Sequence, residues 1–134
     1  MISILLVDDH DIVRRGIQAL LEYELDFNVI GHARNGKDAL SFLERICPDI
    51  IVTDLSMPLC SGVELAAEVQ LRGLLTKVIF LTMHDGEPYI AAAFNAGATA
   101  YVLKQNGVED LAFSIREALS GRRFASPPLT LPMQ

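Results

Sequence analysis

The chain has 134 residues, a length that suits one domain built around one hydrophobic core. Its 17 acidic residues outnumber its 11 basic residues, and the formal charge of −6 argues against direct binding to nucleic acid, which requires clustered cations. The hydrophobic fraction is 51%, but no apolar run approaches the ~20 residues of a membrane helix. The apolar start lacks a basic leader and a cleavage site, so we expect a cytoplasmic protein without membrane contact. Cys47 and Cys60 form no metal-binding or disulfide pattern, in keeping with a reducing compartment.

Short apolar segments alternate with segments of helical periodicity along the chain. The predicted strands are Ile2–Val7, Asn28–Ala33, Asp49–Thr53, Val78–Thr82 and Thr99–Leu103. The predicted helices are Asp11–Glu24, Gly36–Arg45, Gly62–Arg72, Glu87–Ala96 and Val108–Ser120. Strands that are each followed by a helix predict an α/β fold, in which helices cover both faces of a parallel sheet.

Glycine and proline mark where the predicted elements end. Gly97 and Gly121 follow helical patterns, at the position where a left-handed residue often ends a helix. The last stretch, Ser126–Gln134, holds three prolines and cannot continue a helix. We therefore expect one folded domain over residues 1–121 and a linker or tail over residues 122–134.

Polar side chains stand at the carboxyl ends of four predicted strands. They are Asp8, Asp9, Asp54, Thr82 and Lys104. Each one alone has an ordinary structural interpretation, as a helix cap, a strand residue or a solvated lysine. Together they would share one edge of the sheet, which is where open α/β sheets bind their ligands. Three like charges at one edge are unfavourable unless a cation offsets them.

An all-oxygen cluster of this kind suits Mg²⁺, which binds few carboxylates and keeps several waters. Mg²⁺ beside a free carboxylate suggests phosphoryl transfer, in which catalysis consists largely of positioning and charge neutralisation. A carboxylate can itself act as the nucleophile and form an aspartyl phosphate. Lys104 could then pair with the phosphoryl oxygens, and the hydroxyl of Thr82 could donate a hydrogen bond to them.

Four motifs carry a resemblance to a known family. They are LLVDDH at residues 5–10, VTDLSMPLCSG at 52–62, VIFLTMHD at 78–85 and GATAYVLK at 97–104. The chain resembles the receiver domain of bacterial two-component response regulators from residue 2 to about 121. LTMHD and AYVLK resemble the NarL/FixJ-type subfamily, whose output domains are of the LuxR type. The resemblance implies a flavodoxin-like three-layer sandwich with a parallel five-stranded sheet of order 2-1-3-4-5.

The resemblance also assigns roles at the acidic edge. It implies that Asp54 accepts a phosphoryl group from the phosphohistidine of a sensor histidine kinase. It implies Mg²⁺ held by Asp9, Asp54 and the backbone carbonyl of Ser56, with Asp8 in the same metal site, behind these ligands or bridging to the ion through water. Such a domain is not an enzyme in the usual sense, because it catalyses only its own phosphorylation and dephosphorylation.

Other residues are assigned to conformational change. The resemblance implies that Thr82 and Tyr101 form a switch pair, and that Pro58 and Gly62 shape the loop after Asp54. In the NarL/FixJ subfamily a helix-turn-helix domain follows the receiver. We therefore expect DNA contact only through such a domain, which is absent from this chain, and a homodimer after phosphorylation.

One position departs from the common receiver pattern. Many receivers place a proline after the lysine and join it through a cis peptide bond, whereas this chain has Gln105. A cis bond to a residue other than proline costs about 3 kcal/mol. We therefore predict a trans bond between Lys104 and Gln105.

Three other functions are compatible with parts of the sequence. Asp9-His10-Asp11 superficially matches the first motif of haloacid-dehalogenase-type phosphatases, but no acidic pair follows a strand after Lys104, where those enzymes need their second metal ligands, and Asp54 would have no role. A dinucleotide or flavin module needs a glycine-rich turn after the first strand, where this chain has DDHD. A receiver-like interaction domain that is never phosphorylated would usually lose an acid or the lysine, and this chain retains all of them.

Overall fold

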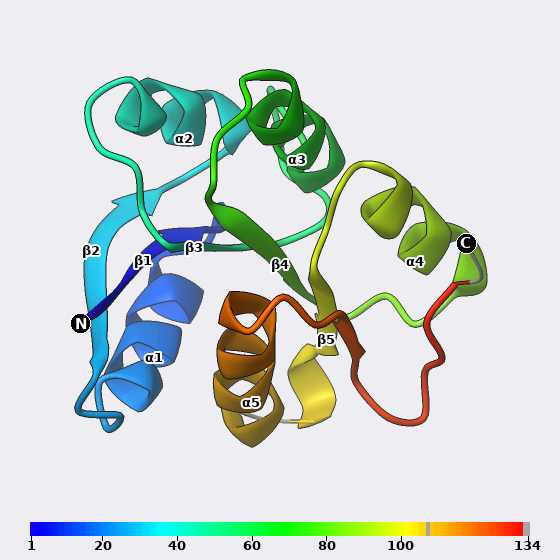
Figure 1. Ribbon diagram of the computed structural model, residues 1–134. Helices are drawn as coiled ribbons and strands as arrows, with labels where there is room; N and C mark the ends of the chain where they lie inside the picture. Colours follow the sequence, from blue (N-terminus) through cyan, green and yellow to red (C-terminus); the bar gives the residue numbers. More distant parts are fainter. Residues whose placement is uncertain (107, 133–134) are drawn as a thin grey trace.

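The computed structural model describes residues 1–106 and 108–132, and it folds as an α/β sandwich (Figure 1). Its strands are β1 (Ile2–Val7), β2 (Phe27–Ala33), β3 (Ile50–Thr53), β4 (Lys77–Thr82), β5 (Ala100–Leu103) and β6 (Phe124–Ala125). Its helices are α1 (Asp11–Leu21), α2 (Gly36–Leu43), α3 (Gly62–Leu71), α4 (Glu87–Asn95) and α5 (Val108–Leu119), with a 3-10 turn, η1, at Lys104–Asn106. No helix in the described ranges is long and apolar enough to span a membrane.

The sheet is parallel throughout and has the order β2-β1-β3-β4-β5-β6. The predicted flavodoxin-like fold and the order 2-1-3-4-5 are therefore confirmed. The sheet differs from the prediction in one respect, because a sixth strand follows the fifth. β1 and β3 are neighbours in the interior of the sheet, so the acids that follow them stand side by side at its carboxyl edge.

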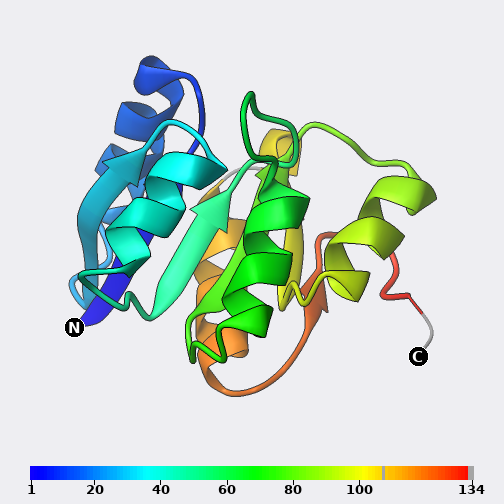
Figure 2. The same ribbon diagram turned by 90° about the horizontal axis from the view of Figure 1, so that it is seen from above.

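Helices cover both faces of the sheet, and each face has its own core (Figure 2). α1 and α5 lie on one face and α2, α3 and α4 lie on the other. β1 shows how the sequence creates both cores, because successive side chains on a strand point to opposite faces. Leu5 and Val7 join the core under α2 and α3, whereas Ile4 and Leu6 join the core under α1 and α5. The apolar run in β1 thus reflects a strand that is covered on both sides.

The five helices begin at the predicted residues and end one to three residues before the predicted ends. Gly97 and Gly121 have φ values of 105° and 83°, so both adopt the left-handed conformation that was predicted for them. α1 was predicted to reach Glu24 but ends at Leu21. The backbone N–H of Glu24 donates to the carbonyl of Leu21 at 3.0 Å, which is a tight turn that directs the chain into β2.

The sixth strand docks part of the predicted tail on the sheet. The N–H of Phe124 donates to the carbonyl of Thr99 at 3.2 Å, and the N–H of Ser126 donates to the carbonyl of Tyr101 at 2.9 Å. The hydroxyl of Ser126 is fully buried and donates to the carboxylate of Asp110 at 2.8 Å. This strand was not predicted, because two residues are too few to show strand periodicity.

Candidate functional site

The polar residues that the sequence analysis selected meet at the carboxyl edge of the sheet. The strand register aligns Val7 of β1 with Thr53 of β3, so the aspartates that follow these two residues stand at the same level. Thr82 is the last residue of β4 and is aligned with Leu103 of β5, immediately before Lys104. The prediction that these residues share one edge is therefore confirmed, because parallel strands all end on the same side.

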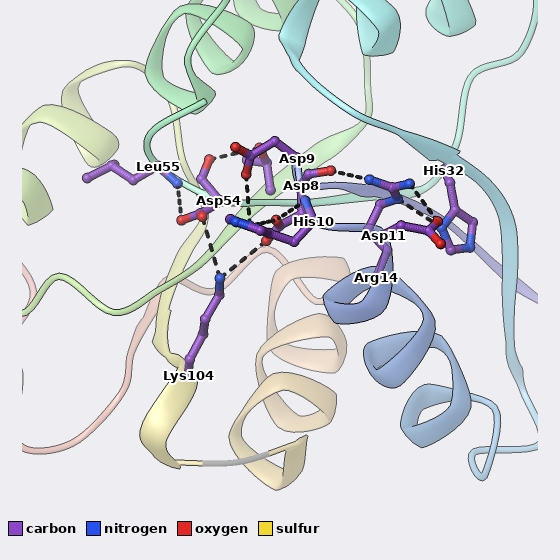
Figure 3. A network of polar contacts seen from close by, with 10 residues as sticks. Asp8, Asp9, His10, Asp11, Arg14, His32, Asp54, Leu55 and Lys104 are labelled. Carbon is purple, nitrogen blue, oxygen red and sulfur yellow. Dashed lines mark hydrogen bonds and ion pairs between the residues drawn. The ribbon is translucent and has the colours of Figure 1, made fainter. Parts of the chain in front are cut away.

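Lys104 lies between two carboxylates from different strands (Figure 3). Its Nζ lies 3.2 Å from Oδ2 of Asp8 and 3.4 Å from Oδ2 of Asp54. The exposed fractions of these side chains are 21% for Lys104, 5% for Asp8 and 17% for Asp54. One ammonium therefore balances two carboxylates in a partly buried pocket, and Asp54 remains open to a reactant from solvent.

Asp8 is the most deeply buried of the acids at this edge. Burial by itself raises the pKa of its carboxyl, but the backbone N–H of His10 and the charge of Lys104 outweigh that effect and hold the pKa below its ordinary value. The N–H of His10 donates to Oδ1 of Asp8 at 2.9 Å. Asp8 is therefore ionised at neutral pH although almost no water reaches it.

Asp9 and His10 complete the acidic cluster. Nδ1 of His10 lies 3.2 Å from Oδ1 of Asp8 and 3.1 Å from Oδ1 of Asp9, so the ring bridges both carboxylates. Ligand atoms of these three residues lie within 4.8 Å of one another, a spacing compatible with a shared metal ion. Because the His10 side chain is 68% exposed, it can leave the carboxylates without disturbing the core. His10 was not among the residues predicted for this site.

The loop after β3 brings the backbone close to Asp54. Oδ1 of Asp54 accepts a hydrogen bond from the N–H of Leu55 at 2.7 Å. A side-chain carbon on Gly62 would lie 2.1 Å from the carbonyl oxygen of Asp54, so this position requires glycine. The carbonyl of Pro58 accepts a hydrogen bond from the N–H of Cys60 at 2.8 Å. These contacts agree with the predicted shaping of the loop, and Ser56 lies exposed within it.

Thr82 and Tyr101 meet the same loop, which joins β4 to α4. The hydroxyl of Thr82, which is fully buried, accepts the N–H of His84 at 3.3 Å. The hydroxyl of Tyr101 donates to the carbonyl of His84 at 2.7 Å. Tyr101 is fully buried and its ring stacks on Phe80, so its side chain points into the protein. Burial, followed by the charges of Asp54 and Asp85, raises the pKa of Tyr101 to about 12.

The peptide bond after Lys104 agrees with its prediction. Among the described residues the one cis bond joins Pro127 to Pro128, so the bond between Lys104 and Gln105 is trans. Lys104 thus begins the 3-10 turn η1 while its side chain still reaches the acids.

Arg14 is a buried cation at this edge that was not predicted from the sequence. Its guanidinium donates to the backbone carbonyl of Asp8, and Arg14, Asp8 and Asp54 line one small cavity beneath the acids. Within the helical pattern of α1 an arginine would ordinarily extend into solvent, so the sequence contains no signal of this contact.

The fold and the site together define a flavodoxin-like α/β domain with an acidic pocket and a lysine at the carboxyl edge of its sheet. A family model described as "Response regulator receiver domain" matches residues 4–116, and the chain belongs to this family.

Curated relatives support the same assignment. The chain is 38% identical over 133 residues to the uncharacterized transcriptional regulatory protein YvfU of Bacillus subtilis (strain 168), covering 99% of this chain and 66% of that protein. It is 34% identical over 133 residues to the response regulator UvrY of Escherichia coli (strain K12), covering 99% of this chain and 61% of that protein. The chain thus spans 61–66% of the length of these two relatives.

Solved structures show the same fold. A LuxR-family two-component response regulator from Aurantimonas sp. SI85-9A1 matches with a TM-score of 0.88 and 36% identity, covering 93% of this chain and 89% of that chain. The signal receiver domain of the putative response regulator NarL from Mycobacterium tuberculosis matches with a TM-score of 0.86 and 28% identity, covering 90% and 98% of the two chains. The predicted membership in the receiver family and its similarity to NarL and LuxR-type regulators are confirmed.

Proposed function

We propose that this domain accepts a phosphoryl group on Asp54 from the phosphohistidine of a sensor histidine kinase. The observation that carries the proposal is the position of Asp54, which contacts Lys104 in an acidic pocket and still faces solvent. Membership in the receiver family supports the proposal, and it gives no support to the alternative of a haloacid-dehalogenase-like phosphatase.

In the proposed reaction a carboxylate oxygen of Asp54 attacks the phosphorus atom of the phosphohistidine. An O–P bond forms, the N–P bond breaks, and the electron pair of that bond returns to the imidazole nitrogen of the kinase. Lys104 stabilises negative charge on the transferred oxygens, and its contact with Asp8 keeps its ammonium at the site. Thr82 stands at the same sheet edge and would donate its hydroxyl hydrogen to the phosphoryl group.

The residues at this edge fit a Mg²⁺ ion. The carboxylates of Asp8 and Asp54 contact Lys104, the carboxylate of Asp9 lies beside that of Asp8, and such oxygen ligands are the kind that Mg²⁺ prefers. Asp9 and Asp54 would hold the ion together with the backbone carbonyl of Ser56, and Asp8 would bind it directly or through water. When bound, Mg²⁺ would neutralise charge on the phosphoryl oxygens. The exposed ring of His10 would then leave the carboxylates that it now bridges.

The proposed output depends on a shift between two conformations. The phosphoryl group adds acceptor oxygens near Thr82 and so draws its hydroxyl away from the N–H of His84. Because Tyr101 holds the carbonyl of the same residue, His84, a change at Thr82 also changes which Tyr101 rotamer is favoured. The free energy of this shift cannot exceed the difference between the free energies with which the two conformations bind the phosphoryl group.

The wider role of the protein is also part of the proposal. We assign residues 1–121 to the receiver and residues 122–134 to a segment that leads to a helix-turn-helix DNA-binding domain outside this chain. The relatives described above are transcriptional or response regulators, which supports a role in transcription. Phosphorylation would favour a homodimer, because helix-turn-helix domains commonly read paired half-sites.

Intact-mass measurement with acetyl phosphate tests the proposal. The chain in Mg²⁺ is expected to gain the mass of one phosphoryl group, which hydroxylamine removes and which excess chelator prevents. Asp54→Asn is expected to abolish the gain. Asp85→Asn, which removes an exposed acid from the loop after β4, is the matched control and is expected to retain it. A full gain of mass in Asp54→Asn would refute the assignment.

A further inference from the structure

Arg14 on α1 is a charged residue that the proposed chemistry leaves without a role, although its side chain is only 6% exposed. Burial of a guanidinium is costly unless its partners replace the lost water. Within the described ranges its one ion pair is with Asp11, whose side chain is 56% exposed. An ion pair with such an exposed partner contributes little. Of the other two contacts of the guanidinium, the one with the backbone carbonyl of Asp8 is buried and the one with the exposed residue His32 is partly buried, so the burial is best explained by the Asp8 carbonyl with His32 in support.

Those two contacts join α1 to the neighbouring strands β1 and β2 (Figure 3). Nη1 of Arg14 donates to the backbone carbonyl of Asp8, and Nε donates to Nδ1 of His32 at 3.2 Å. The Asp8 carbonyl belongs to the peptide bond between Asp8 and Asp9. A guanidinium bound to this carbonyl fixes the plane of the peptide. It thereby sets the directions in which both carboxylates leave the backbone.

The carboxylate of Asp8 in this loop is held by the N–H of His10 at 2.9 Å and by Nζ of Lys104 at 3.2 Å, but neither of these groups contacts the Asp8–Asp9 peptide itself. The N–H of Asp8 donates to the carbonyl of Ala33 at 3.1 Å, which fixes only the beginning of the loop. His10 occupies the N-cap position of α1 but makes no side-chain cap to the helix. Between these points the Asp8–Asp9 peptide is held by Arg14. Two adjacent carboxylates that repel each other would otherwise favour other orientations of this peptide.

His32 is held in a form that can accept the hydrogen bond of Arg14. Its Nε2 contacts Oε1 of Gln18 at 2.5 Å, and an amide oxygen can only accept, so the ring proton resides on Nε2. Nδ1 is therefore free of a proton and accepts from Arg14. Gln18 lies one helical turn after Arg14, so both ring nitrogens of His32 contact the same face of α1.

We propose that Arg14 is a positioning residue for the acidic site and that His32 is the acceptor that holds its guanidinium in place. The inference rests on the proposed function, because its consequence is that Asp8 and Asp9 are pre-oriented for a divalent cation. Arg14 touches no reactant and acts only through the Asp8–Asp9 peptide. His32 acts one step further away, through Arg14.

Binding of Mg²⁺ to the chain, followed by isothermal titration calorimetry, tests this inference. Arg14→Met is expected to raise the Mg²⁺ dissociation constant about tenfold or more, the usual size of effects from residues that orient metal ligands. Arg14→Lys keeps the charge but lacks the fork of donors, so it is expected to lose most of the same affinity. Arg15→Met is the matched control, because Arg15 pairs with the same Asp11 at 3.0 Å but contacts neither Asp8 nor His32. We expect its dissociation constant to stay within about twofold of the parent value.

Two substitutions at His32 separate positioning from simple packing. His32→Asn can place an amide oxygen near the position of Nδ1, so it is expected to retain affinity within about twofold, whereas His32→Leu removes the acceptor and is expected to weaken Mg²⁺ binding several-fold. A structural role alone would lower the melting temperature of both variants and leave the dissociation constant of the folded protein unchanged. That result would overturn the inference.

A second measurement keeps the inference independent of the proposed metal site. In the metal-free protein the amide ¹⁵N resonance of Asp9 reports on the Asp8–Asp9 peptide that Arg14 anchors. Arg14→Met is expected to move this resonance clearly more than Arg15→Met does. Failure of the parent to bind Mg²⁺ would count against the proposed function only, whereas equal Asp9 resonances in the two variants would overturn the role of Arg14.

Discussion

Replacement of Lys104 by methionine tests the electrostatics of the site without any ligand. The substitution keeps most of the length of the side chain and removes its ammonium, which lies between the carboxylates of Asp8 and Asp54. Because Asp8 is almost fully buried, water can replace the lost cation only in part. The variant is therefore expected to unfold more easily than the parent in the absence of Mg²⁺.

The structure sets the size of this effect. At an effective dielectric constant of about 20, charges separated by 3.2 and 3.4 Å attract by about 5 kcal/mol for each pair. Most of this attraction is offset because all three groups lose water on folding. Removing one partner of a buried pair costs about 3–5 kcal/mol, and the partial exposure of Lys104 and Asp54 reduces this figure. We expect the free energy of unfolding to fall by about 2–4 kcal/mol.

Urea denaturation of both proteins at pH 7 measures the loss. Lys37→Met is the matched control, because Lys37 is exposed on α2 and makes no ion pair within the described part of the chain. It is expected to change the free energy of unfolding by less than about 0.5 kcal/mol. If Lys104→Met and Lys37→Met show the same small decrease in the free energy of unfolding, the ammonium of Lys104 does not stabilise the acids and the reasoning is wrong.

The effect of Lys104 also has a predicted pH dependence. The folded protein holds the pKa of Asp8 below its ordinary value of 3.8 despite the opposing effect of burial, and Lys104 is one cause. A carboxyl whose pKa is lower in the folded state than in the unfolded state stabilises the fold at any pH above its unfolded-state pKa. This stabilisation is lost as the pH falls through its folded-state pKa. The difference in the free energy of unfolding between the parent and Lys104→Met is therefore expected to be largest at pH 7. It is expected to shrink once the pH falls below 3.8.

Three further substitutions test individual contacts. Tyr101→Phe loses the hydrogen bond to the His84 carbonyl and is expected to cost about 1 kcal/mol in urea denaturation. Ser126→Ala removes a buried hydroxyl with two hydrogen bonds and is expected to cost about 1–2 kcal/mol, whereas no loss would mean that the docked tail is not part of the fold. Burial and the charge of Arg14 lower the pKa of His32 below its ordinary value of 6.5. The folded state therefore favours the neutral ring, and the protein is expected to lose stability as the pH falls from 6.5 through the folded-state pKa of His32. Between pH 7.5 and 5.5 the melting temperature is therefore expected to fall more in the parent than in His32→Asn.

The part of the site that follows from strand order could be predicted from the sequence. Asp8, Asp54 and Lys104 each stand directly after an apolar strand, and a parallel sheet brings such positions to one edge. Apolar runs of four to six residues were sufficient to locate those strands, because strands covered on both faces contain few polar residues.

The contacts that depend on side-chain direction could not be predicted. Arg14 and His32 are 18 positions apart, and each occupies a position where a solvated residue would be equally acceptable. The bridge that His10 makes between two acids depends on one rotamer of an exposed ring. The strand at Phe124–Ala125 forms because β5 offers an unpaired edge, a property of the folded sheet rather than of those two residues.

Localisation of the phosphoryl group tests the central claim most directly. The phosphorylated chain is reduced with borohydride, which converts an aspartyl phosphate to homoserine, and is then digested with trypsin. Residues 46–72 lie in one tryptic fragment that holds Asp54, whereas residues 1–14 form another that holds Asp8 and Asp9. We expect homoserine at position 54 in the first fragment, together with an unchanged second fragment. Homoserine at position 8 or 9, with Asp54 intact, would contradict the assignment of Asp54 as the phosphoryl acceptor.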